Sequence, residues 1–282
     1  MGSSTAATAP ADGRFSRPLG AQRVLRGLGV GGIAGGYLGI IVLLPLAALL
    51  AQVQTGGFGG FWDAVSNPAS VAALKLTFGA AAIATVVNAV MGTLVAWVLV
   101  RDRFPGIGLI DSLVDLPFAL PTIVAGLTII ALYGPHSPLG VNVAYTRTAI
   151  LLALLFVTLP FVVRAVQPVL EALEPEVEEA AATLGATRLQ TFRRVVLPPL
   201  VPAIATGAGL SFAKAVGEFG SVVLVSGNLP LKTQVASVAI AGRAGAGDTA
   251  GAAALSAVLL AISVVVLLGI ATVGWRTGKR DG

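Results

Sequence analysis

The chain has 282 residues, of which 56% are hydrophobic and 11% are charged, and its formal net charge is +5. Soluble domains carry about 25% charged residues, so this chain lacks the charge to cover the surface of a water-soluble globule. The lack of Cys and the single His exclude a disulfide scaffold, a thiolate zinc site and a multi-His metal centre. The composition therefore indicates an integral membrane protein.

The chain begins with a polar segment rich in Ala, Gly, Ser and Arg, and we expect a disordered basic tail over residues 1–26. A cleaved signal peptide is the alternative, but its apolar core would have about 7–15 residues, and the apolar stretch that follows here is longer. The predicted transmembrane domain covers residues 27–275, and residues 276–282 form a second tail.

Long stretches without charge predict six membrane-spanning helices, because a helix needs about 20 mostly apolar residues to cross the ~30 Å hydrocarbon core. The stretches show no strict alternation of apolar and polar residues, which favours helices over the strands of a barrel. The predicted fold class is therefore an all-α integral membrane protein. The expected spans are roughly 30–53, 72–100, 109–133, 148–169, 199–225 and 250–275.

The third and fourth spans contain charges and prolines. Asp111 and Asp115 lie near one end of the third span and Arg164 near the same end of the fourth, which allows a structural bridge or a role in transport. General acid/base catalysis has little support, since no nucleophile or metal set accompanies the acids. Pro117 and Pro121 remove two helix hydrogen bonds, so we expect a bent or broken span, either beside a transport cavity or as a packing kink.

Residues 170–198 form the one long polar loop, with five glutamates in its first half and three arginines in its second. Pro175 suits the first turn of a helix, and Gly185 permits a turn. A second helical stretch follows, and we expect Pro198 and Pro199 to stop it. The loop is predicted to be a helix–turn–helix on the membrane surface, and a solvated charged connector is the alternative.

The fifth span contains Lys214 near its middle and Glu218 four residues later on the same helix face. A charge at the bilayer centre costs about 2.5–3.5 kcal/mol, so the pair needs an explanation. Two interpretations stay open. The residues form an internal ion pair, or Lys214 lies on an anion pathway with Glu218 holding it or contacting a gate.

The basic residues also predict orientation. Twelve lie at span ends and tails that share one side of the membrane, against four on the other, so both termini are expected to be cytoplasmic. Because these residues mark span ends and form no clustered basic face, we expect no nucleic-acid partner. The twelve are Arg14, Arg17, Arg23, Arg26, Arg101, Arg103, Arg188, Arg193, Arg194, Arg276, Lys279 and Arg280.

Spacing within the loop carries a family resemblance. Glu179, Ala180 and Ala181 are followed after three residues by Gly185, and after nine more by Val195, one residue, Leu197 and Pro198. This pattern resembles the EAA loop of ABC importer permeases, with Val in place of Ile. In that family the loop forms coupling helices that dock on the ATP-binding subunit, and the resemblance implies the permease fold and this docking role for the six matching residues.

Two further stretches narrow the resemblance. DLPFALPTIVAG (residues 115–126) and GEFGS (217–221) resemble sulfate and molybdate permeases, and SGNLPLKT (226–233) resembles the T-type permease of sulfate/thiosulfate importers. The family implies two copies of a cytoplasmic ATPase, a W-type sister permease and an external sulfate-binding protein in a bacterial inner membrane. The residues assigned to the translocation path or gate are Pro117, Pro121, Lys214, Gly217, Glu218 and Phe219.

The chain has no G-x-x-x-x-G-K-S/T phosphate loop, so we expect it to bind no cofactor, with ATP used by the partner subunit. It is therefore expected not to be an enzyme on its own. A permease for molybdate, tungstate or another oxyanion is the alternative. An ATP-independent secondary transporter and a membrane-embedded enzyme are further alternatives, but neither explains the docking loop.

Overall fold

The computed structural model describes residues 32 and 35–278. The predicted tail over residues 1–26 and the last four residues of the tail over 276–282 lie outside the described residues, so both stay predictions. The described residues up to Leu49 form one unit and those from Leu50 onward form another. The second unit contains all the site residues predicted from the sequence.

Every regular element in the described part of the chain is a helix. In chain order these are η1 (Gly39–Leu43), α2 (Leu44–Thr55), α3 (Gly57–Ser66), α4 (Pro68–Arg101), α5 (Ile107–Val114), α6 (Leu116–Ala119), α7 (Thr122–Tyr133), α8 (Arg147–Ala172), α9 (Pro175–Thr183), α10 (Arg188–Thr191), η2 (Phe192–Val196), α11 (Leu197–Val216), α12 (Gly220–Val225), α13 (Ala236–Gly245) and α14 (Thr249–Gly278).

Five helices among the described residues are long and apolar enough to cross a membrane, and a shorter apolar helix, α7, accompanies them. The five are Gly35–Thr55, Pro68–Arg101, Arg147–Ala172, Arg188–Val216 and Thr249–Thr272. They correspond to five of the six predicted spans, and α5, α6 and α7 together occupy the third. The all-α membrane fold is confirmed.

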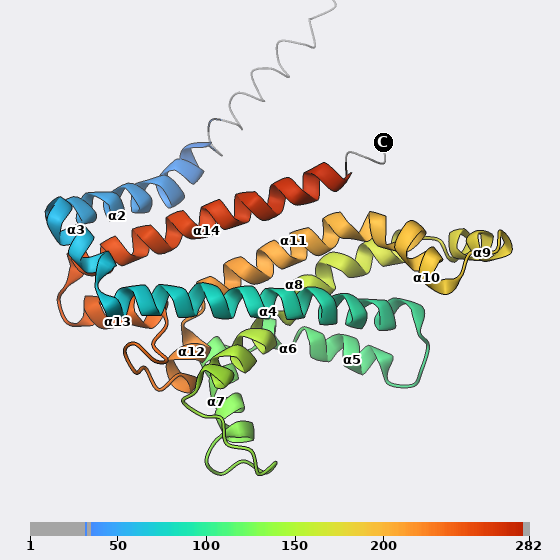
Figure 1. Cartoon of the computed structure of the whole chain (residues 1–282), viewed down its shortest axis with the longest axis horizontal. Coiled ribbons are helices and arrows are strands. Elements are labelled where there is room, and N and C mark those ends of the chain that lie inside the picture. The colour runs from blue at the N-terminus through green and yellow to red at the C-terminus, as the bar shows by residue number, and fades with distance from the viewer. Residues whose placement is uncertain (1–31, 33–34, 279–282) are drawn as a thin grey trace, which may run out of the picture. The chain divides into compact units, whose positions relative to one another are not determined.

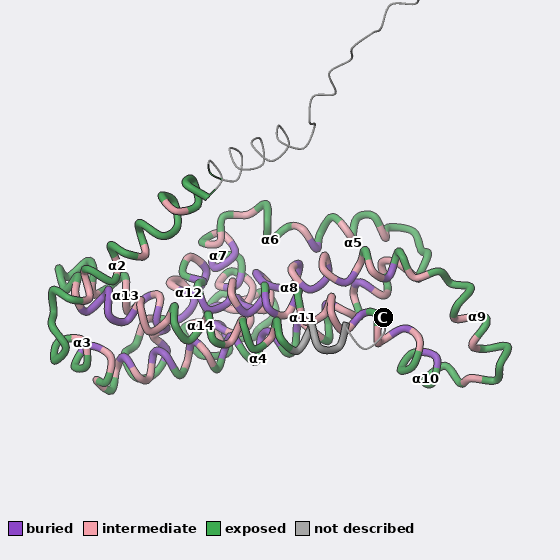
Figure 2. Tube along the Cα trace, turned by 90° about the horizontal axis from the view of Figure 1, so that it is seen from above, coloured by how far each residue is buried: buried purple, intermediate pink, exposed green. Residues whose placement is uncertain are grey.

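α8 lies at the centre of the second unit. α4 and α11 pack along α8 and against each other, and α14 packs along α11 (Figure 1). Figure 2 shows buried residues gathered along α8, whereas α9 has none. Because α8 contacts α5, α6, α7 and α12 as well as α4 and α11, it provides the frame on which the broken segments are mounted.

Small residues set the spacing of these helices. A Cβ added at Gly92 of α4 would lie 2.8 Å from the Val162 Cβ of α8, and one at Gly207 of α11 would lie 2.8 Å from the Val162 Cα. The Asn88 side chain of α4 donates a hydrogen bond to the Thr158 hydroxyl of α8 at 2.8 Å. Close backbone approach and interhelical hydrogen bonds hold helices together in a bilayer, where the hydrophobic effect does not drive their association.

The third predicted span is broken, as its prolines indicated. Three helices, α5, α6 and α7, take the place of one helix over 109–133. Leu120 and Pro121 are both extended, with ψ of 137° and 135°, and they separate α6 from α7. A residue before proline is pushed out of the helical region, and Pro121 has no N–H to continue the helix. Pro117 lies in the first turn of α6, where proline is tolerated.

The expectation of one helix over 199–225 is wrong. α11 ends at Val216, and residues 217–219 separate it from α12. Lys214 therefore lies in the last turn of α11 and not in the middle of a span, and Glu218 lies beyond the helix. The chain leaves the helix here because the Glu218 carboxylate accepts a hydrogen bond from the N–H of Ser221 in the first turn of the next helix.

The expectation that Pro198 and Pro199 stop the second loop helix is also wrong. A continuous helix runs from Arg188 to Val216, and the two prolines lie in its α11 part. The π-helix η2 precedes them, and the Leu197 N–H donates to the Phe192 carbonyl five residues earlier. The wider turn interrupts the usual hydrogen-bond pattern of the α-helix just before the prolines, so their missing N–H groups fall where that pattern is already disrupted.

Two short helices between spans, α3 and α13, were not predicted, because they are too short for a search by span length. Arg243 of α13 donates to the Ala64 carbonyl of α3 at 3.2 Å and to the Ser70 hydroxyl of α4 at 2.8 Å. These contacts fix α13 against α3 and α4.

Candidate functional site

The helix–turn–helix predicted in the long loop is formed by α9 and α10. Residues 179–181 lie in α9, and Gly185 follows its end with φ of +84°. The Gly185 N–H donates to the Ala182 carbonyl, and the Ala186 N–H donates to the Ala181 carbonyl, both at 3.0 Å. These two bonds make a Schellman turn, which requires a left-handed residue at this position. The glycine is therefore needed for conformation, since an added Cβ would meet no atom of this chain within 4 Å.

The second helix of the loop starts with a capping box. The Thr187 hydroxyl accepts from the Gln190 N–H at 3.3 Å, and the Gln190 side chain accepts from the Thr187 N–H at 2.8 Å. Of the predicted docking residues, Glu179, Ala180 and Gly185 are exposed, and Ala181, Leu197 and Pro198 are half-buried. Their docking role stays a prediction.

Arg101, the last residue of α4, joins the loop to the helical domain. Its guanidinium donates to the Leu173 carbonyl and to the Glu178 carboxylate of α9, both at 2.9 Å. It also lies over the Trp97 ring, 5.9 Å from the centroid, and Trp97 makes an edge contact with Phe192 of η2. Movement of α9 is thereby linked to α4 as well as to the adjoining helices α8 and α11.

Exposed apolar side chains on the loop were missed by the sequence analysis. The Leu184 residue is 89% exposed and Leu189 is 64% exposed, and Val177 of α9 is also exposed. Single exposed apolar residues are ordinary, but here three lie within one short charged loop, where they are accessible to a partner. The available signal was the presence of leucines at positions flanking the glycine turn.

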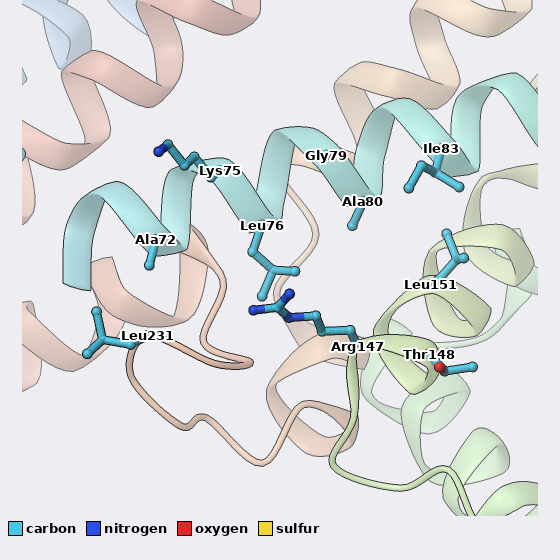
Figure 3. A pocket seen from close by; sticks show the side chains of 10 residues that line it. All are labelled: Ala72, Lys75, Leu76, Gly79, Ala80, Ile83, Arg147, Thr148, Leu151 and Leu231. Carbon is cyan, nitrogen blue, oxygen red and sulfur yellow. The ribbon is translucent and has the colours of Figure 1, made fainter. Parts of the chain in front are cut away.

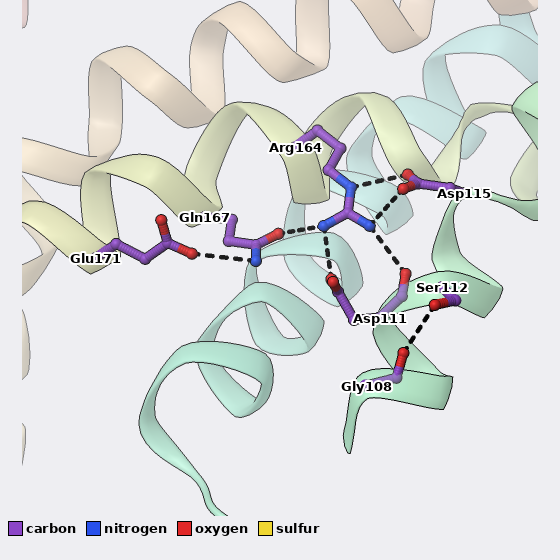
Figure 4. Close-up of polar contacts among 7 residues, drawn as sticks. All are labelled: Gly108, Asp111, Ser112, Asp115, Arg164, Gln167 and Glu171. Carbon is purple, nitrogen blue, oxygen red and sulfur yellow. Dashed lines mark hydrogen bonds and ion pairs between the residues drawn. The ribbon is translucent and has the colours of Figure 1, made fainter. Parts of the chain in front are cut away.

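The Arg164 cluster holds the broken third span against α8 (Figure 4). Arg164 makes a two-pronged contact with the Asp115 carboxylate at 2.8 and 2.7 Å, and reaches the Asp111 carboxylate at 2.6 Å. It also donates to the Asp111 carbonyl and to the Gln167 side chain. All five guanidinium N–H groups are thus used, and the predicted contact between the carboxylates and Arg164 is present.

Lys214 and Glu218 form an ion pair at the break after α11. The Lys214 ammonium lies 2.8 Å from the Glu218 carboxylate, whose side chain is 1% exposed. The same carboxylate accepts from the N–H and the hydroxyl of Ser221, both at 3.0 Å. The Glu218 carbonyl accepts from the Ser237 hydroxyl at 2.7 Å. The pair therefore has a structural role, and its contact with a transported anion stays a prediction.

The two breaks meet where α7 packs on α12. A Cβ added at Gly126 of α7 would lie 2.6 Å from the Ser221 carbonyl oxygen. At Gly220 of α12 an added Cβ would clash with the Thr122 hydroxyl of α7. The glycines are required here because the segments are in backbone contact.

The remaining predicted path residues fall in or beside these breaks. Gly217, Phe219 and Pro121 are exposed, whereas Pro117 is buried. The docking loop and the Lys214 break lie at opposite ends of α11, about 30 Å apart at 1.5 Å per residue. The structure therefore separates the predicted docking residues from the predicted path residues around Lys214, with one group at each end of α11. In the described part of the chain no cluster of His, Cys, Asp and Glu is arranged to hold a metal ion.

Comparison of the helix arrangement with solved structures identifies the fold. A bacterial ABC transporter involved in the import of the acidic polysaccharide alginate matches 91% of this chain and 98% of its own, with a TM-score of 0.73 at 17% identity. The MetNI methionine ABC transporter, in inward-facing conformations, matches 75% of this chain and 95% of its own, with a TM-score of 0.54 at 19% identity. The chain has the permease fold of ABC importers.

Sequence comparisons define the family. A family model described as a binding-protein-dependent transport system inner membrane component matches residues 88–275. The sulfate transport system permease protein CysT of Salmonella typhimurium is 49% identical over 86% of this chain and 91% of its own length. The CysT protein of Escherichia coli is 47% identical over the same shares, and that of Synechocystis is 48% identical over 82% and 84%. The chain is a multi-pass membrane protein that belongs to the inner membrane components of binding-protein-dependent transport systems, and among them to the CysT group of permeases.

Proposed function

We propose that this chain is the transmembrane permease subunit of an ATP-driven sulfate/thiosulfate importer. The observation that carries the proposal is 49% identity to a sulfate permease over 91% of that protein's length. The exposed α9–α10 loop supports it, because a permease without a phosphate loop of its own needs a surface for an ATPase partner.

In this proposal the importer contains two copies of a cytoplasmic ATP-binding subunit, and α9 and α10 of this chain dock on one of them. Glu179, Ala180, Ala181, Gly185, Leu197 and Pro198 form or support the docking surface. ATP is bound and hydrolysed by the partner, and this chain binds no cofactor. A W-type sister permease completes the pathway, and an external sulfate-binding protein delivers the anion. Both termini lie on the cytoplasmic side of a bacterial inner membrane.

The translocation path passes the two breaks. Lys214 is the one cation among the residues assigned to the path, and its pairing with Glu218 weakens its attraction for a dianion, which suits a conduit that the anion must leave. Gly217, Phe219 and Pro121 are the exposed members of the set, whereas Pro117 is buried in the first turn of α6.

The test is reconstitution of the complete complex in liposomes, with labelled sulfate uptake as the measurement. We expect uptake that requires ATP and the binding protein, with competition by thiosulfate. Stronger competition by molybdate or tungstate would assign the permease to those oxyanions. Uptake by this chain alone without ATP would identify a secondary transporter and contradict the proposal.

The docking assignment has its own test. Glu179→Ala and Gly185→Trp should each reduce co-purification of the ATPase, while Asp63→Ala, on α3 at the far end of the helical domain, serves as the control. An intact complex in both loop variants would place the docking surface elsewhere.

A further inference from the structure

A pocket of about 530 Å³ lies between the N-terminal halves of α4 and α8, and none of its lining residues belongs to the proposed docking surface or path. Figure 3 shows its walls on these two helices, with Leu231 of the loop between α12 and α13 at one edge. Both helices begin at this membrane face and run toward the docking loop, so the pocket opens at the opposite face from the loop.

The pocket has a charged mouth and an apolar floor. Lys75 of α4 and Arg147 of α8 line it, and among the described residues neither has an acidic group within ion-pair distance. Ile83 lies eight residues beyond Lys75 and Leu151 four beyond Arg147, which places them about 12 and 6 Å further into the membrane. Polarity thus falls with depth, as it does along a lipid molecule.

The loop that forms the edge is held in a strained shape. Leu231 has φ of +67°, a conformation that side chains other than Gly and Asn rarely adopt. The next residue, Lys232, accepts a hydrogen bond on its carbonyl from Arg147 Nε at 2.8 Å. This bond fixes the arginine at the mouth. Its two terminal nitrogens have no hydrogen-bond partner among the described residues.

We propose that this pocket binds one anionic phospholipid. The phosphate lies on Arg147, and the Lys75 side chain, which Figure 3 shows extending from α4 away from Arg147, turns toward it on binding. An acyl chain lies along the Leu76, Ile83 and Leu151 side chains. Basic pockets between membrane helices bind anionic headgroups on the cytoplasmic side of membranes, and the same attraction between cation and phosphate acts at the face opposite the docking loop. A free oxyanion is a poorer occupant, because it would use only the donors at the mouth (Lys75, Arg147 and Thr148) and leave the aliphatic side chains beneath them uncovered.

The test measures lipid retained by the assembled complex purified in detergent. The complex is incubated with phosphatidylglycerol or phosphatidylcholine, and bound lipid is counted by native mass spectrometry. We expect the wild type to retain phosphatidylglycerol in preference. Lys75→Ala/Arg147→Ala should lower the affinity about 30-fold, since each basic residue near a membrane surface contributes about fivefold.

Two further variants test whether the lipid occupies this pocket or only follows the positive charge of the protein surface. Gly79→Trp is designed to fill the pocket without changing its charge, and a Cβ added at Gly79 meets nothing within 4 Å, so the new side chain starts without a clash. It should also lose the lipid. Arg103→Ala removes an exposed cation near the other end of α4 and should retain it.

Retention of phosphatidylglycerol by Lys75→Ala/Arg147→Ala or by Gly79→Trp overturns the proposal, as does equal retention of phosphatidylcholine by the wild type. Displacement of the lipid by millimolar inorganic phosphate would show that Lys75 and Arg147 bind a free oxyanion, and it would also overturn the proposal. If the double variant does not assemble, Gly79→Trp decides the question. A change in ATPase co-purification is not expected in any of these variants.

Discussion

The two ends of α11 use glycine and charge in opposite ways. At its C-terminal end the Glu218 carboxylate is buried with three hydrogen-bonding partners, and Gly126 and Gly220 have no room for a side chain. At its N-terminal end α9 has no buried residue, and Gly185 has open space around it. The first end needs glycine for close contact, and the second needs it for a left-handed backbone.

This contrast shows why equal substitutions should have unequal effects. A clash with backbone atoms in a packed interior cannot relax, whereas an unfavourable backbone angle in an exposed turn is relieved by local fraying. Four variants would test the contrast, in order of expected loss of stability.

Gly126→Ala should have the largest effect. Its Cβ would lie 2.6 Å from the Ser221 carbonyl oxygen and 3.0 Å from the Ser221 Cα, and neither backbone atom can move without separating α7 from α12. We expect a loss of about 3 kcal/mol in the free energy of unfolding, measured by thermal unfolding in detergent. Gly108→Ala in α5, where the added Cβ meets nothing, is the control and should not destabilise. Equal unfolding temperatures for the two variants would contradict the close contact.

Lys214→Met should follow. It leaves the buried Glu218 carboxylate without its cation, and we expect a loss of about 2 kcal/mol, moderated because the lysine side chain is 37% exposed. Adding Glu218→Gln removes the unpaired charge and should recover more than half of the loss. No recovery in the double variant would show that the lysine stabilises this end of α11 through another contact.

Gly185→Ala should cost about 1 kcal/mol, because an alanine is forced into the left-handed region at φ of +84°. The loss should be local, so hydrogen exchange should increase in α9 while the spans keep their protection. Exchange that increases in α7 and α12 instead would mean that the loop and the break are not separate units.

Leu184→Ser should leave the unfolding temperature unchanged, because the leucine is 89% exposed. Under the proposed function it should still weaken ATPase binding by about tenfold or more, as truncation of a central apolar contact does. Leu139→Ser, which changes another exposed leucine, in the loop after α7, is the control for binding. Equal ATPase affinity in both variants would remove Leu184 from the docking surface.

Features that depend on local sequence were predictable. Length and hydropathy alone indicated the spans, Pro117 and Pro121 indicated the broken third one, and the spacing to Gly185 indicated the turn. The end of α11 was not predictable in this way, because it depends on a carboxylate that binds the next helix. The contact between Gly126 and Ser221 depends on segments far apart in the chain, so Gly126 did not stand out from the other 34 glycines of the sequence.

The π-helix η2 sets the direction in which the docking loop faces. A π-turn holds one residue more than an α-turn, and in an α-helix each residue corresponds to a rotation of about 100° about the axis. Deleting one residue of η2 and restoring α geometry would therefore turn α10 by about that angle relative to α11. Leu189 would then point to a different side of the protein while every side chain of the loop stayed the same. The orientation of the partner thus depends on the number of residues before the prolines as much as on the residues that touch it.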